Sequence, residues 1–177
     1  GINGGVDALW TVIVDENQIA RSQVVKRQQE IRLRKAQEKN KTKEKESVAK
    51  KLSDKDKEAT NEYTKMTAAK AILDVAEERI SKAKQAIVDI KKQIHDESVK
   101  GDSADHAQIV LWQNEIVKQE ALAKTSSEEK RALTDYKRAT GKYDTLATDR
   151  KALRIEVRKI AKESDELSAQ IRTLDEE

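Results

Sequence analysis

The sequence predicts an all-α protein, a long antiparallel two-helix coiled-coil hairpin with one short β-strand at its N-terminus. Two observations predict this fold. Apolar residues recur at every seventh position along two long stretches. The composition, with 39% charged and 3% aromatic residues and no Pro, Cys or Phe, is typical of long helices and cannot supply a globular core. Disorder is the competing interpretation, but disordered chains lack a sustained heptad repeat.

The first element is expected to be the strand, within residues 1–18, which also hold a connector. Val6 to Val14 is rich in β-branched and aromatic residues and follows a Gly pair. Because a lone strand is unstable in water, it must lie on the helices, pair with another copy, or complete a sheet in a neighbouring domain. The chain begins with Gly1 instead of Met, and we expect it to be a piece of a longer protein.

Residues 19–95 are expected to form the first arm, because neither Pro nor Gly interrupts them. Counting in sevens from Leu52, with companion positions three or four residues away, gives a seam that needs a partner helix. The part of this arm that precedes the seam is weakly apolar, and we expect it to be less firmly packed. The seam comprises Val48, Leu52, Ala59, Met66, Ala69, Leu73, Ala76, Ile80, Ala83, Ile87, Ile90 and Ile94.

Residues 96–106 are expected to form the hairpin tip, and residues 107–177 the second arm. The heptads stop after His95, and the following segment holds Gly101 together with the turn and N-cap residues Asp102, Ser103 and Asp105. The seam of the second arm then changes phase by two residues, which predicts a local irregularity. That seam comprises Ile109, Ile116 and Ala123, followed by Ala132, Tyr136, Ala139, Tyr143, Leu146, Leu153, Val157, Ile160, Leu167, Ile171 and Leu174.

Charge favours antiparallel pairing within one chain. The net charge is only +3, but residues 21–57 hold fourteen Lys or Arg against six acidic residues, whereas residues 163–177 hold six acidic residues and one Arg. An antiparallel hairpin brings these two stretches together, with Leu52 near Leu153 and Met66 near Ala139. The same basic stretch could bind phosphate groups, so a nucleic-acid-binding helical arm is an alternative function.

The sequence offers little for catalysis. It has no Gly-rich phosphate loop and no Ser-His-Asp or Cys-His arrangement, so we expect this chain not to be an enzyme and to need no cofactor. His95 and His106, with neighbouring carboxylates, could ligate zinc, but solvated turn residues are the simpler interpretation. Trp112 lies in a run of four apolar residues, where it could either stay exposed for binding or pack back as a clasp.

The order of these features resembles the receptor-binding coiled-coil hairpin of E-group colicins and related nuclease bacteriocins. The resemblance depends on the segment Val6-Asp7-Ala8-Leu9-Trp10, the basic helix start from Val25 to Glu30, a tip that opens with His95-Asp96, a second histidine at His106, and Trp112-Gln113 on the return arm. It covers most of the chain. The segment from His95 to Trp112 is longer than the family's pattern.

The resemblance implies a secreted domain of an antibacterial toxin that acts at the outer surface of the target cell. Pairing within one chain favours a monomer, with a dimer formed through the strand or by swapping of the arms as the alternative. Its tip would dock on an outer-membrane transporter, the vitamin B12 transporter or another TonB-dependent transporter, and a nuclease or other killing domain would lie elsewhere in the parent chain. A purely structural spacer is a further alternative. The implied receptor-facing residues are His95, Asp96, Glu97, Val99, Lys100, Gly101, Asp102, Asp105, His106, Ile109, Trp112 and Gln113.

Overall fold

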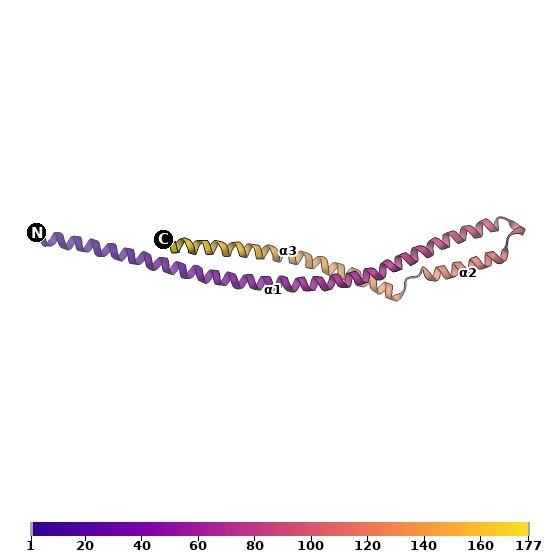
Figure 1. The fold of residues 1–177 in the computed structure, drawn as a ribbon, viewed down its shortest axis with the longest axis horizontal. Helices are drawn as coiled ribbons and strands as arrows, with labels where there is room; N and C mark the ends of the chain where they lie inside the picture. The colour runs from indigo at the N-terminus through magenta and orange to yellow at the C-terminus, as the bar shows by residue number, and fades with distance from the viewer. Residues whose placement is uncertain (1, 177) are drawn as a thin grey trace. The chain divides into compact units, whose positions relative to one another are not determined.

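The computed structural model describes the backbone of residues 2–176 and the side chains of residues 12–176. Helix α1 (Ile2–Ser98) is followed by a 3-10 turn, η1 (Gly101–Ser103), and by helices α2 (His106–Leu122) and α3 (Ser127–Glu176). The chain returns along α1 as an antiparallel hairpin, which confirms the predicted all-α architecture (Figure 1). None of the helices in this described part has a segment long and apolar enough to cross a membrane.

The predicted N-terminal strand is wrong. Helix α1 includes Val6 to Val14 and continues without a boundary at residue 18, and the described residues contain no strand. A helix satisfies its backbone hydrogen bonds within itself, whereas a strand needs a neighbour. The preference of β-branched residues for strands is smaller than the cost of leaving a strand unpaired.

The contacts divide the chain into two units, of which unit 2 comprises residues 56–148. Its helices pack through small side chains, and the predicted seam positions in α1 and α3 are all buried or half-buried. The rings of Tyr63 and Tyr143 contact each other near one end of this unit in a tilted arrangement, with centroids 5.9 Å apart, which agrees with the predicted register of Met66 and Ala139. The most buried seam residues of this unit are Ala59, Ala69, Ala76, Ala83, Ala132, Ala139 and Leu146.

Unit 1 comprises residues 1–55 of α1 and residues 149–177, and it pairs the basic stretch with the acidic one. Lys41 forms an ion pair of 2.5 Å with Glu163, and Arg34 donates a hydrogen bond to Gln170. The Glu163 carboxylate raises the pKa of Lys41 above its ordinary value. These pairs confirm the antiparallel orientation and the register that the sequence predicts for Leu52 and Leu153.

Residues 107–177 were predicted to form one continuous arm, but they do not form a single helix. The arm is interrupted between Leu122, where α2 ends, and Ser127, where α3 begins. The two-residue phase change after Ala123 is therefore accommodated by breaking the helix, a stronger irregularity than a distortion of the supercoil. We call residues 123–126 the joint. The tip is also shorter than predicted, because α1 extends to Ser98.

Candidate functional site

The tip turn is held together by the carboxylate of Glu97. One Glu97 oxygen accepts a hydrogen bond from the backbone N–H of Asp105 at 2.8 Å, and the other accepts from the ammonium of Lys100 at 2.7 Å. The Lys100 ammonium, together with the Asp105 N–H, lowers the pKa of Glu97. The turn residue Lys100 and the start of α2 at Asp105 are thus both fixed to the end of α1.

The other residues of the tip turn also fix its conformation, through their backbone geometry and their hydrogen bonds. Gly101 has a φ of 63°, a left-handed conformation that favours glycine. The Ser103 hydroxyl donates to the carbonyl of Lys100 at 2.8 Å, and Ala104 is buried beneath the turn. Asp105 caps α2, because its side chain accepts a hydrogen bond from the N–H of Gln108 at 3.0 Å. The cap and turn roles predicted for Gly101 and Asp105 are confirmed.

The twelve predicted site residues fall into two classes. Glu97, Ile109 and Trp112 are half-buried, and Glu97 bonds Lys100 and Asp105. The other members are exposed, with Val99 leaving 69% of its surface accessible. The exposed set is His95, Asp96, Val99, Lys100, Gly101, Asp102, Asp105, His106 and Gln113.

Trp112 lies on the same face of α2 as Ile109 and Ile116, the seam that faces α1. Of the two roles considered for it, this position fits the clasp. Its neighbours Val110 and Leu111 are exposed instead, at 52% and 61%. The apolar surface near the tip is therefore provided by Val99, which the predicted site included, and by Val110 and Leu111, which it did not.

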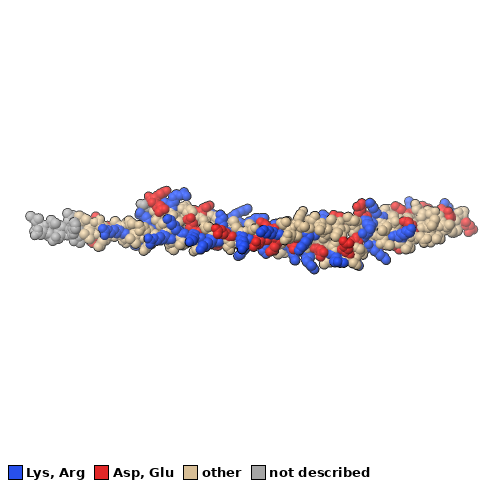
Figure 2. Space-filling view, turned by 60° about the horizontal axis from the view of Figure 1, so that its bottom comes forward, with Lys and Arg blue, Asp and Glu red and all other residues tan. Residues whose placement is uncertain are grey.

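Val110 belongs to an uncharged outer face of α2, whereas Leu111 lies on a neighbouring face that also carries Glu115 and Lys118. Val110, Asn114, Val117 and Ala121 recur at helical spacing on the side of α2 away from the seam, and Val117 is 63% exposed. Figure 2 shows mainly uncharged atoms over the end of unit 2 that contains the tip. Only Glu115, Lys118 and Glu120 are charged in all of α2. A helical-wheel projection of residues 106–122 would have identified this uncharged face from the sequence.

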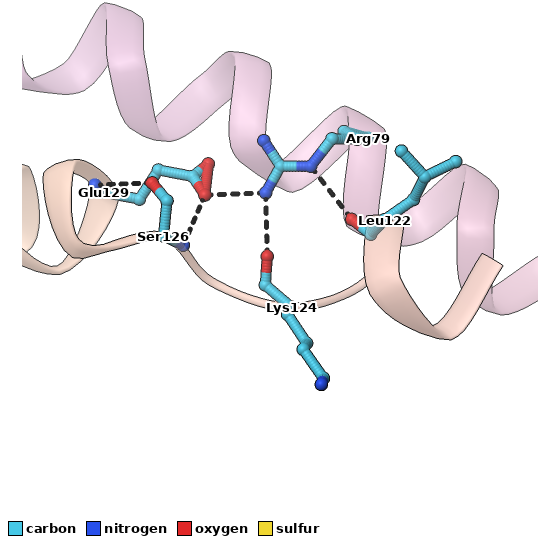
Figure 3. A network of polar contacts seen from close by, with 5 residues as sticks. All are labelled: Arg79, Leu122, Lys124, Ser126 and Glu129. Atoms are coloured by element: carbon cyan, nitrogen blue, oxygen red, sulfur yellow. Dashed lines mark hydrogen bonds and ion pairs between the residues drawn. The ribbon is translucent and has the colours of Figure 1, made fainter. Parts of the chain in front are cut away.

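The joint forms a second cluster of polar contacts (Figure 3). Arg79 on α1 donates to the carbonyls of Leu122 at 2.9 Å and Lys124 at 3.1 Å, and to the Glu129 carboxylate at 2.6 Å. Glu129 also accepts from the N–H of Ser126, while the Ser126 hydroxyl accepts from the N–H of Glu129. This reciprocal pair is a capping box, and the sequence Ser126-Ser127-Glu128-Glu129 was the signal for it.

Neither cluster has the ligands of a metal centre. Within the described residues, no three His, Cys, Asp or Glu side chains gather closely enough to hold an ion, and the structure does not bring His95 and His106 into such a group. A groove of about 730 Å³ lies beside the joint and is lined by aliphatic side chains, among them Leu73, Ile80 and Leu133, and by charged and polar ones. It holds no histidine that could act as a general base.

The basic stretch considered for nucleic acid is partly neutralised. Lys41 contacts both Glu44 and Glu163, and Glu38 and Glu46 lie between the other lysines. On the face shown in Figure 2, acidic and basic side chains alternate.

The fold and the site define a class of molecule, a helical hairpin whose tip turn is ordered and whose outer face near the tip is apolar. Comparison with protein families, with curated proteins and with solved structures finds no match to this chain.

Proposed function

We propose that this chain is the receptor-binding domain of a secreted antibacterial toxin of the bacteriocin type, and that its tip docks on an outer-membrane transporter of a Gram-negative bacterium. The observation that carries the proposal is the apolar outer face of α2 beside the ordered tip turn. Only three residues of α2 are charged, and Val110, Leu111 and Val117 are all more than half exposed.

Exposed aliphatic side chains favour burial against a partner. Removing apolar surface from water is the main driving force of association, and contiguous exposed apolar residues mark interaction sites. Val99 at the turn and Val110 and Leu111 on α2 bracket the same end of unit 2. They supply an apolar contact, and the surrounding polar residues, His95, Asp96 and Gln113, supply directional hydrogen bonds at its rim.

The contacts of Glu97 support recognition because they order the turn before binding. A mobile loop loses conformational freedom when it docks, and this loss weakens binding. Here the Glu97 bonds to Lys100 and Asp105 already fix the turn. A tip fixed in this way loses less entropy when it binds a transporter.

In this proposal the domain acts by anchoring. Docking at the cell surface raises the local concentration of the parent toxin's other segments near the membrane, so no chemistry is required of this chain. Secretion, action outside the producing cell, and a killing domain elsewhere in the parent toxin are parts of the same proposal.

The test compares exposed residues of equal accessibility at the tip and away from it. Val99 and Val75 are 69% and 68% exposed, and Leu111 and Leu33 are 61% and 60% exposed. The full chain carrying Val99→Ser with Leu111→Ser is compared with the control carrying Val75→Ser with Leu33→Ser. Binding is measured first to the purified vitamin B12 transporter in detergent, and then to transporters captured from outer-membrane extracts and identified by mass spectrometry.

We expect the unaltered chain and the control to bind one TonB-dependent transporter, and the tip variant to bind about tenfold more weakly or worse. If no transporter binds, or if both variants bind equally, the proposal is wrong. Binding to RNA or DNA that weakens steeply with salt, without transporter binding, would instead support the nucleic-acid arm.

A further inference from the structure

The groove of about 730 Å³ beside the joint takes no part in the proposed receptor contact. One of its walls is the face of α1 from Leu73 to Val88, and the other comprises Thr125 of the joint and the start of α3 as far as Leu133. Two apolar side chains of these walls remain accessible, Val88 at 60% and Leu133 at 44%. Both walls belong to unit 2, so the groove is a feature of one compact unit and offers it apolar surface for a ligand.

The lining of the groove changes from aliphatic to polar along its length. Because α3 runs antiparallel to α1, Leu133 lies toward the Leu73 end of the groove and Thr125 lies toward the Lys84 end. The first end therefore gathers the aliphatic side chains of Leu73, Ala76, Ile80 and Leu133. The second end gathers hydrogen-bond donors that can bind an anion, the side chains of Ser81, Lys84 and Thr125.

Lys84 supplies the polar end with a positive charge that its own helix does not neutralise. One turn of α1 carries both kinds of lysine. Lys82 pairs with Glu78 at 2.9 Å, whereas Lys84 has no acidic residue three or four positions away in either direction. The ammonium of Lys84 is therefore placed to attract an anionic group.

The other charges of the groove are offset within the protein. The buried Glu129 carboxylate is bonded to Arg79 at 2.6 Å. Since these two residues lie side by side, Lys130 on α3 lies about level with Glu77 on α1, and their opposite charges flank the aliphatic end from the two walls. The groove thus combines an aliphatic end without net charge and a cationic end.

We propose that this groove binds a free fatty acid, a carboxylate with one long unbranched chain. The chain lies over Leu73, Ile80 and Leu133, and the carboxylate lies at Lys84. The volume falls within the range of small-molecule sites, about 300–1,000 Å³. The α1 wall spans roughly 22 Å along the helix axis, which suits an extended chain better than a compact ligand. This site does not depend on the proposed receptor.

Isothermal titration calorimetry of the full chain tests the ligand class. The probes are decanoate, dodecanoate and tetradecanoate, each kept below the concentration at which it forms micelles. We expect the dissociation constant to fall about tenfold for every two added methylene groups, because each is buried against aliphatic side chains. Dodecyltrimethylammonium, which has a cationic head, should bind at least about tenfold more weakly than dodecanoate. Equal binding of these two overturns the proposal, and so does binding only to vesicles of anionic phospholipid, or none at all.

A matched pair of substitutions tests the position of the carboxylate. Lys91 lies one heptad beyond Lys84 on the same face of α1 and is exposed, but it does not line the groove. We expect Lys84→Gln to weaken dodecanoate binding by about tenfold and Lys91→Gln to leave it unchanged. Equal effects of the two substitutions would contradict the assignment.

Amide chemical shifts test where the chain lies. In ¹⁵N-labelled protein, dodecanoate should shift signals from residues 73–88 and 125–133. If it instead shifted those of residues 110–121, the ligand would lie on the outer face of α2 and the proposed site would be wrong.

Discussion

The return path of unit 2 is interrupted at the tip and again at the joint, and the two interruptions are held differently. At the tip, Lys100 is 55% exposed and Glu97 is 15% exposed, and both belong to the end of α1 and the turn itself. At the joint, Glu129 is 7% exposed and is bonded to Arg79 from the opposite helix. The tip is a local turn that exposes its ion pair to solvent, whereas the joint is held by a cross-helix ion pair whose carboxylate, Glu129, is buried.

The comparison of the tip with the joint shows that a break in a helix can either expose side chains to solvent or join two helices through a packed contact. The tip needs no distant residue and leaves Val99 and Asp102 to solvent. The joint has no glycine with a left-handed backbone, and its exposed carbonyls at Leu122 and Lys124 are satisfied by one guanidinium. Substitutions should therefore affect stability at the joint and recognition at the tip.

The largest effect is expected for Arg79→Ala. This change removes three donors at once and leaves the Glu129 carboxylate, which lies among packed side chains, without its cation. We expect loss of hydrogen-exchange protection around residues 120–130 and a lower melting temperature. Arg79→Lys should recover only part of the lost stability, because an ammonium cannot match the forked geometry of a guanidinium.

The matched change at the tip is Lys100→Ala, which removes an exposed ion pair and should have little effect on melting. If Lys100→Ala destabilised the protein as much as Arg79→Ala, the distinction between the two interruptions would fail.

The second-largest effect is expected from acid, which should weaken the contacts that hold the joint. Arg79 is the main cause that lowers the pKa of Glu129 from 4.5 to about 2, and the Ser126 N–H adds to it. Because the folded-state value is the lower one, this contribution to stability is complete above about pH 4.5 and is lost as the pH falls towards 2. Thermal unfolding should be followed through this range for the unaltered chain and for Glu129→Gln.

We expect Glu129→Gln to be less stable at neutral pH and to lose less stability between pH 4.5 and 2. Other carboxylates with lowered pKa values, such as Glu97 and Glu163, contribute to both proteins and cancel in the difference. Parallel stability curves for the two proteins would show that Glu129 does not carry the effect.

Effects of about 1 kcal/mol, with opposite signs, are expected from one substitution made at two glycines. Gly101→Ala at the tip should destabilise by about 1 kcal/mol, because its φ of 63° is unfavourable for alanine. Gly141→Ala within α3 should stabilise by up to about 1 kcal/mol, since alanine is the better helix former. An added Cβ meets no atom within 4 Å at either position, so the backbone alone decides the sign. Urea unfolding measures both, and effects of the same sign would contradict this explanation.

Much of this fold follows from periodicity. The seams counted from Leu52 and from Ala132 are buried or half-buried along their whole length, because two apolar positions per heptad can only be covered by another helix. The pair Lys41–Glu163 confirms the register that the same counting implies. The tip was also predictable, since Gly101 and Asp105 are residues that only a turn and a helix start require.

The remaining features depended on contacts that periodicity does not reveal. The run from Val6 to Val14 has strand-forming residues, but without a neighbouring strand the helix prevails. The joint depends on Arg79, which is 50 residues from Glu129 and looks in the sequence like any other exposed charge. In the site, the heptad accounts for the half-buried Trp112, whereas Val110, which belongs to the apolar run noted in the sequence, and Val117 fall outside the heptad and were not included in the predicted site.

The spacing of partners along the chain also determines how unit 2 can fold. Glu97 and Asp105 are 8 residues apart, whereas Arg79 and Glu129 are 50 apart. Closing a long loop costs more entropy than closing a short one, so we expect the tip to close first. Once the tip has closed, α1 and the return path are already joined, so each further turn of one helix meets its partner turn after closing only a short additional loop. Unit 2 should zip up rapidly from its turn, and the segment proposed to meet the receptor is also where folding begins.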